Sequence, residues 1–230
     1  MKKRILILGG SSDISKGLIK NIDLDKYDLF LHYNKNKPQN LSKQIGLIKK
    51  DFTLLNVKNS NRLLKNVYSY DIIINLIGYI DNKSYLESNY QSLIKSLNAN
   101  FIAPLFIIKN SIKWMEKNKF GRIINCSSIG TKFGGGKNTF NYSISKHCSE
   151  FIPQELRKLS SKNVIFNNIK VGVINTKIHK KISSKKIKNR IKLIPAKRMG
   201  ETNEIIKLIL FLINENTYIS SETINISGGE

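Results

Sequence analysis

The sequence predicts an α/β fold in which helices cover both faces of one doubly wound parallel sheet. Short apolar runs alternate with helical patterns along the whole chain, the order that parallel strands and their crossovers require. The apolar runs contain few polar residues, which is typical of strands that are buried on both faces. A length of 230 residues and a hydrophobic content of 40% suit one domain, residues 1–230, with a sizeable core.

Each predicted strand is a short apolar run that ends near a turn residue. The first run, 3–8, stops at Gly9 and Gly10, and the run 71–77 stops at Gly78. The predicted strands are 3–8, 27–33, 47–51, 71–77, 122–127, 164–171 and 223–226. Right-handed crossovers between them place a binding crevice at the carboxyl ends of the strands.

The helices fall between these runs. The predicted helices are 15–22, 61–67, 86–115, 142–159 and 203–213. Pro104 lies within the third of them and Pro153 within the fourth. Because a proline inside a helix removes one backbone donor, we expect a kink at Pro153.

The chain is strongly basic, with a formal net charge of +23. An anionic partner or substrate would explain this charge, and so would a lysine-rich composition that covers solvated surface. The sequence shows no helix-turn-helix, zinc-finger or aromatic-basic RNA-binding motif, so we expect no nucleic-acid partner.

Cysteine usage and hydropathy predict a soluble, unprocessed, cytoplasmic protein. Cys126 and Cys148 are too few for a disulfide framework, and we expect both to be packing residues. The apolar run near the N-terminus is too short for a signal peptide, and no stretch approaches the roughly 18 residues of a membrane span. The three histidines lack metal-ligand spacing, so we expect no metal: His32, His147 and His179.

Tyr142 and Lys146 are the residues that point most directly to chemistry. They are four residues apart and share one face of a helix. A nearby cation lowers the pKa of a phenol from its usual value of about 10, which yields a proton donor that works near neutral pH. Two other pairs have this spacing, Tyr33/Lys37 and Tyr79/Lys83. Only Tyr142 also has a serine, Ser128, 14 residues upstream.

The turn between the first strand and the first helix predicts phosphate binding. It reads Leu8-Gly9-Gly10-Ser11-Ser12-Asp13-Ile14-Ser15-Lys16-Gly17 and does not fit the Gly-x-Gly-x-x-Gly pattern. The free amides of a helix N-terminus attract a pyrophosphate. An ordinary strand-to-helix turn is the other interpretation, but the position at the start of an alternating α/β chain favours a cofactor. We expect Asp13 to cap the helix.

The end of the second strand favours NADP(H) over NAD(H). The segment 33–37, Tyr-Asn-Lys-Asn-Lys, contains no acidic residue to bind the ribose hydroxyls of NAD. Its lysines would instead attract the extra phosphate of NADP.

Further motifs occur in a consistent order along nearly the whole chain. They are Lys50-Asp51-Phe52-Thr53, Asn75-Leu76-Ile77-Gly78, Asn100-Phe101-Ile102-Ala103-Pro104, Val171-Gly172-Val173-Ile174-Asn175-Thr176, the stretch 194–205 and Ile226-Ser227-Gly228-Gly229. Together with the features above, they resemble the short-chain dehydrogenase/reductase family in its compact single-domain form, and within it the 3-oxoacyl-[acyl-carrier-protein] reductases. The resemblance implies a Rossmann-type fold. Departures from the family pattern are Leu8, Asp13 and Ser15 in the first turn and Val171 before Gly172.

The resemblance implies hydride transfer between a nicotinamide and a carbonyl or alcohol carbon. Tyr142 would donate the proton, Lys146 would lower the tyrosine pKa and bind the nicotinamide ribose, and Ser128 would orient the carbonyl oxygen. Asn100 would hold a water that links Lys146 to solvent. Ser127 in place of Ser128, and Asn100 as a plain helix-kink residue, are the alternatives. The implied cofactor-binding residues are Gly9, Ser11, Ser12, Asp13, Ile14, Tyr33, Asn34, Lys35, Asp51, Phe52, Asn75, Gly78, Tyr142, Lys146, Gly172, Ile174 and Thr176.

The segment 177–198 is where the family places its substrate lid. It contains ten lysines or arginines and no acidic residue. It is either a solvated basic loop or the binding surface for an anionic, small-molecule or carrier-linked carbonyl substrate. Lys119 and Lys162 lie where the family's carrier-dependent ketoacyl reductases have basic residues.

Three functions remain open at this point. The first is NADP-dependent reduction of a carbonyl compound, with 3-oxoacyl thioesters as the named class. The second is a keto-sugar or nucleotide-sugar reductase in surface-polysaccharide synthesis, and the third is a catalytically weak nucleotide-sensing or scaffold protein. The resemblance also implies a homotetramer or homodimer that assembles through the predicted helices 86–115 and 142–159.

Overall fold

One parallel sheet organises the computed structural model, which describes residues 2–176 and 184–230. Its seven strands are ordered β3-β2-β1-β4-β5-β6-β7, and every neighbouring pair is parallel. They are β1 (Lys3–Leu8), β2 (Tyr27–Tyr33), β3 (Gly46–Lys49), β4 (Ile72–Asn75), β5 (Gly121–Ser128), β6 (Val164–Val171) and β7 (Thr223–Ile226). The predicted doubly wound parallel sheet is confirmed. Because strands from both ends of the chain join it, the sheet also supports the prediction of one domain.

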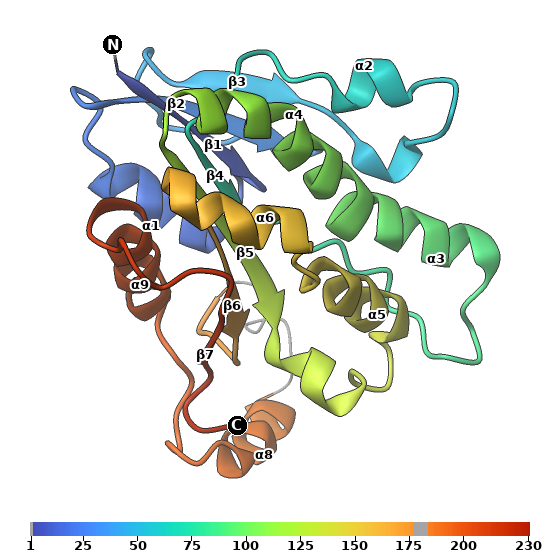
Figure 1. Cartoon of the computed structure of the whole chain (residues 1–230). Coiled ribbons are helices and arrows are strands. Elements are labelled where there is room, and N and C mark those ends of the chain that lie inside the picture. Colours follow the sequence, from blue (N-terminus) through green and yellow to red (C-terminus); the bar gives the residue numbers. More distant parts are fainter. Residues whose placement is uncertain (1, 177–183) are drawn as a thin grey trace.

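Helices cover both faces of this sheet (Figure 1). They are α1 (Asp13–Asn21), α2 (Ser60–Leu64), α3 (Tyr90–Leu97), α4 (Ala103–Lys117), α5 (Phe140–Ser149), α6 (Gln154–Lys158), α8 (Ser184–Leu193) and α9 (Thr202–Asn214). The alternation of side chains along a strand divides the core into two clusters. Ile5 and Ile7 of β1 pack with residues of α1 and α9 on one face. Leu6 and Leu8 pack with residues of α4 on the other.

The prediction of one continuous helix over residues 86–115 is wrong. Helix α3 begins only at Tyr90, after Asn89 and Ser92 form a reciprocal capping box. Residues Asn98–Ile102 then form a π-helical turn, and α4 continues from Ala103 to Lys117. Pro104 lies in the first turn of α4, where its missing N–H is tolerated. A π turn often marks a functional site, and this one carries Asn100.

The predicted kink at Pro153 is instead a complete break. A proline ring clashes with the carbonyl four residues earlier, and here that residue is Ser149. Helix α5 ends at Ser149, and α6 begins at Gln154, directly after the proline. The helix predicted at residues 61–67 is also shorter than expected, and it covers only Ser60–Leu64.

The chain changes direction in the sheet between β1 and β4, which are neighbours although two strands separate them in sequence. Such a switch point opens a crevice at the carboxyl ends of the strands. Gly9 follows β1 at that edge and Leu76 follows β4. In the described part of the chain, no helix is long and apolar enough to cross a membrane.

Candidate active site and dinucleotide crevice

The first turn requires glycine for two reasons. Gly9 has a φ of +83°, a conformation that side-chain-bearing residues rarely adopt. A Cβ on Gly9 would also stand 2.9 Å from the carbonyl carbon and oxygen of Leu76. The turn after β1 therefore lies directly against the end of β4. This close approach places the predicted phosphate turn in the crevice.

Ser12, and not Asp13, caps helix α1, so the predicted capping role of Asp13 is wrong. The Ser12 hydroxyl accepts the backbone N–H of Ser15 at 3.1 Å. Asp13 is the first residue of the helix and lies 3.5 Å from the Lys16 ammonium. An acid in a first turn favours the helix dipole. The pairing with Lys16 also reduces the repulsion that Asp13 would exert on a bound pyrophosphate.

Two segments that were predicted to bind the adenosine half, residues 33–35 and 51–52, meet beside this turn. Tyr33 ends β2, and its carbonyl accepts the backbone N–H of Lys50 at 3.0 Å. The Asp51 carboxylate caps the following 3-10 turn by accepting the N–H of Thr53 at 3.0 Å. Phe52 is buried and stacks on His32, with ring centroids 4.4 Å apart. Lys35, two residues after Tyr33, is exposed.

The three predicted catalytic residues come together at the ends of β4 and β5. The Tyr142 phenol hydrogen-bonds the Ser128 hydroxyl. The Lys146 ammonium donates to the carbonyls of Ile77 and Cys126, each at 2.6 Å. Its nitrogen lies 6.0 Å from the centre of the Tyr142 ring. Serine, phenol and ammonium thus lie at one place in the crevice, next to Gly78 and the phosphate turn.

The predicted lowering of the Tyr142 pKa by Lys146 is wrong for this structure. Burial raises the pKa of Tyr142, against a smaller lowering by the hydrogen bond to Ser128. Burial also lowers the pKa of Lys146 to about 8. A raised pKa keeps the phenol protonated at neutral pH. A protonated phenol is the form that a proton donor needs when a carbonyl is reduced.

The geometry distinguishes Ser128 from Ser127. The Ser128 hydroxyl faces Tyr142 and also accepts the N–H of Gly130 at 3.2 Å. Ser127 is buried and donates to the carboxylate of Glu150 at 2.5 Å. The contact between Ser128 and Tyr142 favours Ser128 as the substrate-orienting serine.

Asn100 connects three elements around the catalytic helix. Its amide donates to the Ser145 hydroxyl on α5 at 2.8 Å and to the Tyr79 carbonyl at 2.9 Å. Its side-chain oxygen accepts the Tyr79 N–H at 2.8 Å. The side chain is fully buried and holds the π turn, the loop after β4 and α5 together. Its predicted role in holding a water stays a prediction.

Asn75 belongs to a row of buried amides that crosses the sheet. Its amide donates to Asn125 on β5, and the Asn125 amide donates to Asn168 on β6, both at 2.8 Å. Asn75 pairs with Asn125 and Asn125 with Asn168 in the strand register. Because the Asn75 side chain is fully buried within the sheet, its predicted contact with a cofactor stays a prediction.

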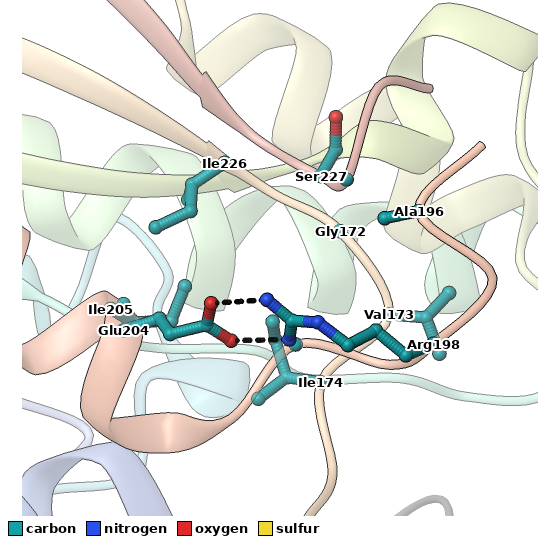
Figure 2. A pocket seen from close by; sticks show the side chains of 11 residues that line it. Gly172, Val173, Ile174, Ala196, Arg198, Glu204, Ile205, Ile226 and Ser227 are labelled. Atoms are coloured by element: carbon teal, nitrogen blue, oxygen red, sulfur yellow. Dashed lines mark hydrogen bonds and ion pairs between the residues drawn. The ribbon is translucent and has the colours of Figure 1, made fainter. Parts of the chain in front are cut away.

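The predicted nicotinamide-end segment follows β6. A Cβ on Gly172 would stand 2.6 Å from the Cα of Ser227, so only glycine fits there. Ile174 is buried and pairs with Gly200. Figure 2 shows the small cavity that this segment lines together with Arg198 and Glu204, whose ion pair has contacts of 2.8 and 2.7 Å. Thr176 is the last residue described before 184.

The predicted basic lid is only partly described. Residues 177–183 lie outside the described residues, and α8 forms the part from Ser184 to Leu193. Within the described chain, no group of three or more His, Cys, Asp and Glu side chains could hold a metal ion. Cys126 is buried and free, and burial raises the pKa of its thiol to about 12, which suits the predicted packing role.

Two functional candidates were missed by the sequence. Asn141, the residue before Tyr142, is fully buried and donates to Asp81 at 2.6 Å, which fastens the loop after β4 to α5. Glu150 accepts hydrogen bonds from Ser127 and Thr131 and pairs with Lys170 at 3.0 Å, which fastens the segment around Ser128. The signal that the sequence offered for Asn141 and Glu150 was a polar residue next to a segment that was expected to be buried. Their partners are distant in sequence.

Comparison with known proteins finds relatives of this chain. Residues 56–230 match the family model described as enoyl-(acyl carrier protein) reductase. A 3-oxoacyl-[acyl-carrier-protein] reductase, FabG of Buchnera aphidicola, is 34% identical over 186 residues, which are 79% of this chain and 76% of that protein. The 3-oxoacyl-[acyl-carrier-protein] reductase MabA of Mycobacterium tuberculosis is 24% identical over an alignment of 236 positions, which covers 100% of this chain and 93% of that protein.

Solved structures share the fold over almost the whole chain. A 3-oxoacyl (acyl-carrier-protein) reductase of Agrobacterium tumefaciens with NADP bound has a TM-score of 0.84 at 17% identity, covering 99% of this chain and 94% of that one. A 4-hydroxyisoleucine dehydrogenase complexed with NADH has a TM-score of 0.83 at 22% identity, covering 99% and 98%. At these identities, the structural likeness shows the fold.

The protein belongs to the short-chain dehydrogenase/reductase family. It is an NAD(P)-dependent oxidoreductase that acts on a carbonyl or alcohol group.

Proposed function

We propose that this enzyme reduces the carbonyl of a 3-oxoacyl thioester with NADPH. The observation that carries the proposal is the hydrogen-bonded pair of Tyr142 and Ser128, both half-buried, beside the buried Lys146 ammonium. The similarity to FabG and MabA supports the substrate class. When bound, the nicotinamide supplies the hydride, and the protein has to supply a proton and a place for the developing negative charge.

The side chains divide this task between them. Tyr142, held protonated by burial, donates its proton to the carbonyl oxygen. Ser128 hydrogen-bonds the same oxygen and stabilises the charge that develops on it. Lys146 is held at the strand ends by two carbonyls and would bind the nicotinamide ribose. Asn100 and Asn141 fix the helix that carries both Tyr142 and Lys146.

The preference for NADPH rests on the end of β2. Residues 33–37 carry two lysines and no acid, and Lys35 is exposed there. Lys35→Glu should weaken NADPH binding and leave NADH binding unchanged, measured by fluorescence titration of both nucleotides. Lys20→Glu, an exposed lysine on α1, is the matched control for net charge. If parent and Lys35→Glu discriminate equally between NADPH and NADH, Lys35 does not select the cofactor.

The substrate class is tested with a panel of carbonyl compounds. The panel contains a 3-oxoacyl thioester on a carrier protein, the same acyl group on coenzyme A, a neutral ketone and a nucleotide-linked keto-sugar. Highest kcat/KM for the thioesters supports the proposal, and highest kcat/KM for the keto-sugar replaces it with the polysaccharide role. Nucleotide binding without turnover on any carbonyl would indicate the sensing or scaffold function.

A carrier-linked substrate should also show a stronger dependence on salt than a neutral ketone, because screening weakens attraction between a basic protein and an acidic carrier. Lys119 and Lys162 lie at the amino end of β5, the end opposite Ser128. Eight residues of strand, on the order of 25 Å, separate the two ends. Lys162 is also paired with Glu116. Equal salt sensitivity for both substrates would argue against carrier docking.

Assembly into a homodimer or homotetramer is part of the proposal. An apolar groove of about 810 Å³ runs between α4 and α6, lined by residues such as Leu105, Ile112, Phe151 and Leu156. A second copy packed along α4 would bury it. Light scattering would give the number of subunits, and a monomer at micromolar concentration would contradict this part. The cytoplasmic location stays a prediction, in keeping with the two free cysteines.

A further inference from the structure

His32 is a buried side chain that none of the motifs above includes. It is the sixth residue of β2, opposite Leu8 of β1 in the strand register. The residue is only 5% exposed, and burial lowers the pKa of the imidazole to about 4. The ring is therefore neutral at physiological pH, with one nitrogen that donates and one that accepts.

The two ring nitrogens contact two different loops. The Nδ1 atom accepts the backbone N–H of Gly9 at 3.4 Å, a long hydrogen bond. The Nε2 atom lies 3.0 Å from the Lys50 carbonyl. Because a carbonyl can only accept, the Nε2 atom carries the proton and Nδ1 is the acceptor, so both contacts require the same tautomer. One neutral ring satisfies a donor and an acceptor on separate segments.

The remaining contacts of His32 involve the same segments. Its backbone carbonyl accepts the N–H of Gly10 at 2.7 Å, so Gly9 and Gly10 of the phosphate turn are both bonded to this one residue. Its ring stacks on Phe52, with an interplanar angle of 20° and centroids 4.4 Å apart. Tyr33, the first residue of the segment with the cofactor-selecting lysines, follows it directly in the chain.

We infer that His32 is a positioning residue that sets the relative placement of the phosphate turn, the adenine segment 51–52 and the cofactor-selecting end of β2. This role rests on the proposed dinucleotide site, although not on the choice of NADPH over NADH. It would act on the adenosine half of the cofactor. The hydride-transfer centre at Tyr142 lies beyond β4, across the switch point.

Substitutions can remove the two hydrogen bonds separately. Asn places an amide oxygen near the position of Nδ1 and can keep the contact with Gly9. Gln places an amide nitrogen near the position of Nε2 and can keep the contact with Lys50. His32→Leu removes both. Ile169→Val, a buried substitution on β6 in the catalytic half, is the control for a general loss of stability.

Three quantities are measured. The first is the Kd of NADPH or NADH, whichever the parent binds better. The second is the Kd of the matching adenosine half, which is adenosine 2′,5′-bisphosphate for NADPH and ADP for NADH, and the third is kcat at saturating cofactor. We expect His32→Leu to raise the dinucleotide Kd about tenfold, and the adenosine-half Kd equally, with kcat unchanged within about twofold. His32→Asn and His32→Gln should each show a smaller increase. Hydrogen exchange at residues 9–10 and 50–52 should accelerate together in His32→Leu.

Two results would overturn the inference. In the first, all three His32 variants bind the dinucleotide with a Kd within twofold of the parent's, and their thermal stability falls as it does in Ile169→Val. His32 would then be a packing residue only. The other is a fall in kcat with an unchanged Kd. A parent that binds NADH better than NADPH contradicts the proposed cofactor and leaves the His32 test intact. A parent that binds neither refutes both.

Discussion

The two halves of the sheet position their functional groups by different means. On the side of β1, β2 and β3, the buried polar side chains of residues 2–70 are only Ser15 and His32, and the crevice is formed by glycine backbone and an aromatic stack. On the side of β4 to β7, buried asparagines recur throughout. They are Asn75, Asn98, Asn100, Asn125, Asn141, Asn167, Asn168 and Asn216.

The difference reflects what each half has to present. A pyrophosphate is bound by backbone amides, which need only close approach and a free helix end. Proton donation requires particular side-chain atoms within a fraction of an ångström of their working positions. Buried hydrogen bonds supply that precision, because a strand or helix that shifts leaves an amide unpaired in a medium of low polarity. We therefore expect substitutions in the two halves to fail in different measurements.

The largest effect should come from Tyr142→Phe. Loss of the proton donor should lower kcat by about 10²–10⁴-fold, because a positioned general acid contributes that much. Binding of NADPH should stay close to that of the parent, as measured by fluorescence titration. Tyr85→Phe, on an exposed side chain, is the control and should retain activity. Full turnover in Tyr142→Phe would show that another group donates the proton.

Ser128→Ala should follow, with kcat reduced about 10²–10³-fold, because one donor to the developing oxyanion is lost. Ser127→Ala is the matched control, since Ser127 donates to Glu150 and not to the reacting oxygen. Ser127→Ala should mainly lower the thermal stability, with a smaller loss of kcat than in Ser128→Ala. Steady-state kinetics of both variants decide the assignment, and a larger kcat loss in Ser127→Ala would reverse it.

An intermediate effect is expected from pH in the nucleotide half. The folded-state pKa of His32, about 4, lies below the usual 6.5, so the unfolded chain binds more protons between these values. Stability should therefore decrease as the pH falls from 6.5 to 4, by on the order of 3 kcal/mol from this residue. Unfolding curves at several pH values would show it. In His32→Asn this part of the slope should disappear, and an identical slope in both proteins would contradict the assignment.

A further effect, on stability, should come from Asn125→Leu in the catalytic half. The change leaves the Asn75 amide, the Asn168 oxygen and the Ser149 carbonyl without their partner and should cost about 1–3 kcal/mol for each stranded group. Ile7→Val, equally buried in β1, is the control and should cost about 0.5–1.5 kcal/mol. Denaturant unfolding measures both. A loss in Asn125→Leu no larger than in Ile7→Val would mean that the amide row does not set the stability of this half.

The sequence by itself determined the alternation of strands and helices that makes a doubly wound parallel sheet, and it predicted the candidate catalytic residues. Apolar runs that end in glycine or serine define the strands locally, and the spacing of Tyr142 and Lys146 follows from the period of one helix. These features depend on residues close together in the chain, so they can be read without knowing which segments meet. Tyr33/Lys37 and Tyr79/Lys83 have the same spacing as Tyr142/Lys146, and local context distinguishes them, because neither has a serine 14 residues upstream.

Only the tertiary structure decided which buried polar groups find each other. His32 meets Gly9 and Lys50 because the register of β1, β2 and β3 aligns residues far apart in sequence. Asn75, Asn125 and Asn168 form a row for the same reason. The raised pKa of Tyr142 depends on its burial, which the spacing to Lys146 did not predict. Long-range register and burial, and not local pattern, therefore govern the precision of this site.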